Sequence, residues 1–226
     1  MWQTVFGIIA VLVLAALLAR QFLDKLAQRK AAPFALFGEA AALLTDAAIS
    51  EGEAAGSYRL SGRFQGHDVQ VKAITDTLAV RKLPSLWLMV TLPGTLPVRA
   101  TFDLMMRPAG PTTFSNFEQL PYGIQRPPEF PEHANVRTDD PAKLIPPHVV
   151  APHLAPFFGP RAKELLISPK GLRIVVLLAE ADRARYGVFR QADFGDTVLA
   201  PDMLKDLLDR LLALRKDIED WHTSTS

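Results

Sequence analysis

The strongest hydrophobic pattern in the chain is an unbroken apolar run at its start. Residues 1–19 carry no charged side chain, and Gln3 and Thr4 are their only strongly polar residues. An α-helix rises about 1.5 Å per residue, so this run spans roughly 28 Å, close to the hydrocarbon thickness of a bilayer. The sequence therefore predicts a transmembrane anchor over residues 1–19, with the lipid bilayer as its partner.

A cleaved signal peptide is the main alternative for this run. Signal peptides begin with basic residues, have a shorter apolar core and end at a small-x-small cleavage site. Here no Lys or Arg precedes the apolar run, and Leu17 and Leu18 stand directly before Ala19. These features favour an anchor that is retained.

The segment that follows the apolar run is basic. Residues 20–33 hold four Lys or Arg side chains and one acidic residue, Asp24. The positive-inside rule places such a juxtamembrane segment in the cytoplasm. We therefore expect a single-pass protein of a bacterial inner membrane with a cytoplasmic domain. A periplasmic domain is the alternative, because the short N-terminus offers little charge for comparison.

Two further segments show the period of an amphipathic helix. The spacing predicts one helix over residues 31–50, with Phe34, Phe37 and Leu44 among its apolar positions. It predicts a second over residues 201–221, where leucines repeat along one stripe and Pro201 suits the first turn.

Strict alternation of polar and apolar residues predicts two β-hairpins. Residues 57–64 and 68–73 alternate around the turn Gln65-Gly66-His67. Residues 164–168 and 172–179 flank the turn Ser168-Pro169-Lys170-Gly171, whose proline and glycine suit a tight reversal.

The remaining strand predictions are less regular. Residues 86–92 are apolar on both faces, as expected for a central strand covered by helix on one side. Residues 98–104 alternate and predict a neighbouring strand, and Val188 with Phe189 predict a short edge strand. Residues 141–158 predict a helix that several prolines interrupt.

The segment 107–133 is rich in proline and lacks a regular period. It also contains four aromatic residues, which are Phe114, Phe117, Tyr122 and Phe130. One interpretation is a packed loop that buries these rings against the domain. The other is a partner-binding surface, for which these four residues are the candidate binding residues.

Together these elements predict an α+β fold: an N-terminal transmembrane helix followed by a mainly antiparallel sheet packed with helices. We expect one domain over residues 34–222, with a frayed end over residues 223–226. Two small subdomains separated by the proline-rich loop are the alternative.

Composition narrows the function without defining it. The net charge is +1, which gives no argument for nucleic acid as a partner, and the absence of cysteine excludes disulfides and thiolate metal sites. The sequence contains no nucleophile elbow and neither of the common glycine-rich nucleotide-binding motifs. It therefore predicts no catalytic residue and no cofactor.

The histidines and carboxylates do not form a clear metal-binding or catalytic motif in the sequence. His148 and His153 are badly spaced for two ligands on one helix face, so no metal site is predicted. Four acidic residues are weak candidates for a site assembled by folding. They are Asp103, Glu164, Asp193 and Asp196. Charges on alternate strand positions usually face solvent, which is the simpler expectation for them.

These observations favour a non-enzymatic protein that binds or scaffolds a component of a membrane complex. The predicted partner is another protein or a second copy of this chain. The alternative is a membrane-tethered enzyme with a carboxylate or histidine site that forms only in the folded protein.

Overall fold

The computed structural model describes residues 14, 17–21, 23, 35–52, 57–76, 83–108, 110–183, 192 and 194–225. Most of the predicted anchor, most of the basic segment and the predicted strand at 188–189 lie outside these residues. Among the residues described, no helix is long and apolar enough to cross a membrane.

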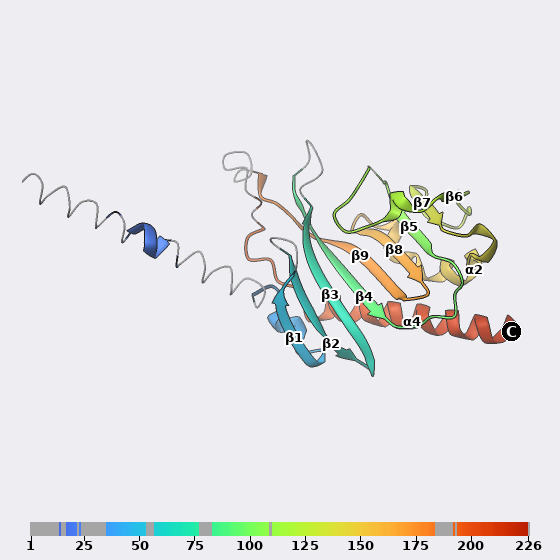
Figure 1. Cartoon of the computed structure of the whole chain (residues 1–226), viewed down its shortest axis with the longest axis horizontal. Coiled ribbons are helices and arrows are strands. Elements are labelled where there is room, and N and C mark those ends of the chain that lie inside the picture. The colour runs from blue at the N-terminus through green and yellow to red at the C-terminus, as the bar shows by residue number, and fades with distance from the viewer. Residues whose placement is uncertain are drawn as a thin grey trace, which may run out of the picture.

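The described residues form one antiparallel sheet of nine strands in the order β1-β2-β3-β4-β9-β8-β5-β7-β6 (Figure 1). The strands are β1 (Thr45–Glu51), β2 (Tyr58–Phe64), β3 (His67–Asp76), β4 (Ser85–Pro93), β5 (Phe102–Met106), β6 (Tyr122–Ile124), β7 (Ala134–Thr138), β8 (Ala162–Ser168) and β9 (Gly171–Glu180). Both predicted hairpin regions belong to this one sheet. The mainly antiparallel sheet packed with helices is the architecture that the sequence predicts.

Both predicted hairpins form. β2 and β3 pair around a tight turn at Gln65 and Gly66, which both adopt a positive φ. β8 and β9 pair around the second turn, where Gly171 has a φ of 135° and a Cβ would lie 2.3 Å from the carbonyl oxygen of Leu92. Glycine is therefore required at this position by both conformation and space.

The helix predicted over residues 31–50 is wrong in its second half. Residues 35–41 are helical, but the chain then turns and continues as β1. β1 pairs with β2 as an edge strand, and most of its side chains are exposed. An exposed edge strand needs no apolar alternation, so its pattern did not distinguish it from a helix.

The strand predicted over residues 98–104 begins later, at Phe102. Just before it, the backbone N–H and side-chain hydroxyl of Thr101 donate to the carboxylate of Asp139, at 2.7 and 2.9 Å. The Asp139 side chain therefore accepts the hydrogen bond that a neighbouring strand would otherwise accept from the Thr101 backbone.

Helices cover one face of the sheet. α4 (Pro201–Thr225) packs its leucine stripe against β4, β9 and α2 (Pro147–Val150), and it continues through residues 223–225, where fraying was predicted (Figure 1). The interrupted helix predicted over residues 141–158 is a series of single turns. These are η2 (Pro141–Lys143), α2, η3 (Ala151–His153) and η4 (Ala155–Phe158).

The opposite face of the sheet is covered by part of the proline-rich loop. Here Met89, Met105 and Val175 point from three strands into a small second core. Phe114 and Phe117 from the loop complete it. We call residues 112–120 of this loop, which include η1 (Phe117–Gln119), the strap. The loop also contributes β6, and β7 follows it; the sequence pattern predicted neither strand.

Candidate functional site

Two acidic side chains lie buried beneath the strap. Asp103 of β5 and Glu164 of β8 are on adjacent antiparallel strands, and their registers place them diagonally on the same face of the sheet. Their exposed fractions are 2% and 0%. The expectation that these charges face solvent is wrong, because the strap covers the face on which they lie.

Glu164 is held by two partners. The guanidinium of Arg173 on β9 contacts Oε2 of Glu164 at 3.0 Å through Nη2 and at 3.2 Å through Nε. The hydroxyl of Ser115 in the strap donates to Oε1. Burial raises the pKa of Glu164, although Arg173 and Ser115 favour the ionised form. Paired in this way, Glu164 can carry its charge inside the protein.

Asp103 has a different environment. Its Oδ1 is buried and has no hydrogen-bond partner among the described residues. Burial, and next the negative charge of Glu164, raise the pKa of Asp103 to about 8 against the opposing charge of Arg173. One cation and two carboxylates lie together here, so the pair holds one proton near neutral pH. We assign this proton to Asp103, because Glu164 has the ionic partner.

The strap is attached to this face by polar contacts at both ends. Near its start, Ser115 donates to Glu164 and accepts a hydrogen bond from the N–H of Phe117 at 3.0 Å. At its end, Nη1 of Arg137 on β7 donates to the carbonyl oxygens of Glu118 at 3.3 Å and Leu120 at 2.7 Å. The Arg137 guanidinium also lies 5.7 Å from the centre of the Phe117 ring.

The four predicted binding residues separate into two groups. Phe114, Phe117 and Phe130 are buried. Phe114 packs on Trp87 of β4, with ring centres 5.5 Å apart, whereas Phe130 packs edge-on against Phe102 at 6.2 Å on the helix-covered side.

Tyr122 differs from these three. Its side chain is 51% exposed, and it lies on β6, the last strand in the order of the sheet that the described residues form. In this conformation Tyr122 is the predicted binding residue whose ring is accessible to a partner.

The histidines and the other acidic candidates lie elsewhere. His153 pairs with Asp217 of α4 at 2.8 Å, whereas His148 and Asp196 are exposed and Asp193 is not among the described residues. Within the described ranges, no three His, Cys, Asp or Glu side chains are placed to hold a metal ion.

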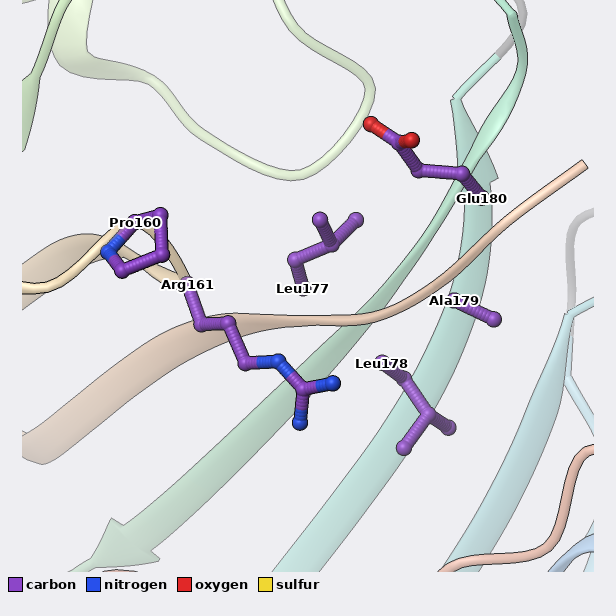
Figure 2. Close-up of a pocket in the computed structure, with 6 residues that line it drawn as sticks. All are labelled: Pro160, Arg161, Leu177, Leu178, Ala179 and Glu180. Atoms are coloured by element: carbon purple, nitrogen blue, oxygen red, sulfur yellow. The ribbon is translucent and has the colours of Figure 1, made fainter.

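A hollow of about 340 Å³ lies at the end of β9 (Figure 2). It is lined by Pro160, Arg161, Leu177, Leu178, Ala179 and Glu180. In Figure 2 the charged ends of Arg161 and Glu180 point apart, so this hollow does not bring polar groups together around one ligand position.

Sequence reasoning missed two members of the buried cluster, Ser115 and Arg173, and it missed Arg137, which holds the end of the strap. Ser115 has the signature of a turn residue, and Arg173 and Arg137 have that of solvated charges on alternating strands. One signal was present: Asp103 lies within a run that is otherwise apolar from Phe102 to Met106. An acidic residue in such a run indicates a strand that is covered on both faces.

Comparison with known proteins gives little further information. No family model matches the chain, and no curated protein matches it. The crystal structure of the mycobacterial trehalose monomycolate transport factor A, TtfA, aligns with a TM-score of 0.37 and 10% identity. The alignment covers 74% of this chain and 87% of that chain. A TM-score this low supports no argument about fold or function.

Proposed function

We propose that this is a single-span membrane protein whose folded domain is a non-enzymatic binding module of a membrane complex. The observation that carries the proposal is the contrast between the buried and the exposed parts of the loop. Asp103 and Glu164, whose pKa values are raised, are covered by the strap. Tyr122 is exposed on β6, at the end of the described sheet.

An edge strand with an exposed aromatic side chain has two features of a protein-recognition surface. β6 pairs with β7 on one side, and it is the last strand in the order of the described sheet. Its backbone can therefore extend the sheet with a strand from a partner, and the Tyr122 ring supplies apolar area with a polar tip. Tyrosine is enriched in interfaces for this reason.

The membrane part of the proposal rests on the sequence. The apolar run over residues 1–19 has the length of a bilayer-spanning helix, and the basic residues after it favour a cytoplasmic domain. Fusions at the C-terminus test the orientation. We expect a green fluorescent fusion to be bright and an alkaline phosphatase fusion to be inactive; the reverse result places the domain in the periplasm.

Site-specific photocrosslinking in native membranes tests the binding surface. A benzoylphenylalanine at position 122 should give one discrete crosslinked product, either with another protein or with a second copy of this chain. The matched control is position 158, because Phe158 is 68% exposed but lies on η4 rather than on β6. Equal crosslinking from both positions, or none from position 122, contradicts the proposal.

A membrane-tethered enzyme is the second candidate, and the buried carboxylate pair is the observation that favours it. Carboxylates with shifted pKa values are frequent in active sites. Catalysis at this pair requires the strap to open, because neither side chain reaches solvent in the closed form. Carbodiimide modification of Asp103 and Glu164 in the folded protein, and protection of both residues by a small-molecule substrate, would support this candidate. Modification of these residues only after unfolding would contradict it.

A further inference from the structure

The strap and the sheet meet through contacts that depend on charge. Ser115 donates to the carboxylate of Glu164, and Arg137 donates to two carbonyl oxygens of the strap. Arg137 is also the direct register partner of Asp103, on the neighbouring strand β7. Residues directly opposite each other in an antiparallel pair share a face and have Cβ atoms about 4.5–5.5 Å apart. The Arg137 side chain therefore begins beside Asp103, while its guanidinium is bonded to the strap.

We propose that the strap is a proton-dependent latch: it is closed while Asp103 is neutral, and it opens when Asp103 ionises and draws Arg137 away from the carbonyl oxygens of Glu118 and Leu120. This inference goes beyond the proposed binding function and does not depend on it.

Charged groups reach Asp103 from each strand packed around it. Glu164 faces it from β8 and Arg173 from β9, where these two residues form an ion pair with each other. Arg137 lies opposite on β7. Lys163 of β8 lies at the end of β5, where its Nζ donates to the carbonyl oxygens of Met106 and Arg107. From the strap itself, the nearby ionisable residue is Glu118, whose side chain is exposed.

This arrangement is balanced when the pair holds one proton. Glu164 and Arg173 then neutralise each other, and Asp103 adds no charge. If Asp103 loses its proton, the buried cluster holds two negative charges and one positive charge, which is costly in a low-dielectric interior. While the strap is closed, burial and the charge of Glu164 hold the pKa of Asp103 near 8, so ionisation becomes favourable as the pH approaches this value.

Arg137 is the group that can restore the balance. It lies on the same face as Asp103, and its present partners are neutral carbonyl oxygens. A hydrogen bond between two charged groups is stronger than one to a neutral carbonyl. When Arg137 turns to an ionised Asp103, the end of the strap loses two hydrogen bonds and the contact of the guanidinium with Phe117. Ionisation is thereby coupled to release of the strap.

Trp87 reports on the position of the strap, because its ring packs on Phe114. The chain has three tryptophans, so Trp2→Phe with Trp221→Phe leaves Trp87 as the sole emitter. In the full chain purified in detergent, raising the pH from about 6 to about 9 brackets this ionisation. We expect the Trp87 emission to move to longer wavelength with a midpoint at or below about pH 8, because opening favours the ionised form of Asp103. The far-ultraviolet circular dichroism should stay constant.

Three variants in this background make the test specific. Asp103→Asn cannot ionise, so its emission should stay at short wavelength throughout. Arg137→Gln should show long-wavelength emission already at the acidic end. Arg126→Gln is the matched control: Arg126 donates to the carbonyl oxygens of Pro127 and Phe130, in the part of the loop beyond the strap. Its transition should match that of the parent protein.

Two results overturn the latch. One is an emission that does not change with pH in the parent protein. The other is a transition that persists unchanged in Asp103→Asn. If Asp103→Asn does not fold, the parent titration together with Arg137→Gln decides: closed-strap emission of Arg137→Gln at the acidic end overturns the proposal.

Discussion

Asp103 and Arg137 lie directly opposite each other on β5 and β7, yet the Arg137 guanidinium bonds to the backbone of the strap. Opposite charges that face each other across an antiparallel pair of strands attract, so an ion pair is expected if both groups are ionised. The different arrangement here is explained if Asp103 is neutral, since a neutral carboxyl group attracts a guanidinium only weakly. The protonation of Asp103 thus helps to determine where the loop lies.

The stability of the protein should decrease as the pH rises from about 5 to about 8. The pKa of Asp103 is about 8 when folded and near 3.8 when unfolded. Between these values the folded state holds a proton that the unfolded state has released, so raising the pH favours unfolding by up to a few kcal/mol. Urea unfolding followed by circular dichroism measures this. Asp103→Asn should show a flatter profile, and identical profiles would contradict the assignment.

Arg173→Gln should be strongly destabilising at neutral pH. It leaves Glu164 buried without a counter-ion, which costs about 3–5 kcal/mol. The loss should shrink at lower pH, because protonation then removes the unpaired charge. The matched control is Arg210→Gln, which removes the exposed pair with Asp206 on α4 and should change stability by less than about 1 kcal/mol. Similar losses in both variants would show that the buried pair has no special role.

Phe117→Ala should destabilise the domain, whereas Tyr122→Ala should not. The Phe117 ring is buried in the same small core as Met105 and Met89, so truncation leaves a cavity and costs about 3–5 kcal/mol. Tyr122 is largely exposed, and its loss should cost less than about 1 kcal/mol. Melting temperatures measure both. Equal shifts would mean that the strap is not packed on the sheet as described.

Gly171→Ala should weaken the hairpin between β8 and β9 by about 2–4 kcal/mol. The added methyl group would meet the carbonyl oxygen of Leu92 at 2.3 Å, and the positive φ adds strain. Gly123→Ala is the control, because a Cβ there meets nothing within 4 Å. A small effect of Gly171→Ala in denaturant unfolding would show that β4 can move aside at this turn.

The local pattern of apolar and polar residues was sufficient to predict the elements in which that pattern is periodic. The two hairpins alternate with a period of two around glycine-containing turns, and the leucine stripe of α4 repeats with the helical period. Each signal arises from one buried and one exposed face, so it can be read from a short segment. β1 and β6 lack such a signal because they are mostly exposed edge strands, and β7 is too short to show one clearly.

The sequence by itself determined the apolar run at the N-terminus, the main strands and the C-terminal helix, because these depend on residues that are near one another in the chain. Only the tertiary structure decided that Ser115, Asp103, Glu164 and Arg173 meet. They come from the strap and from β5, β8 and β9, which are neighbours in the sheet although β5 is far from β8 and β9 in the sequence. Which charges are buried depends on where the proline-rich loop lies, and no local pattern encodes that position.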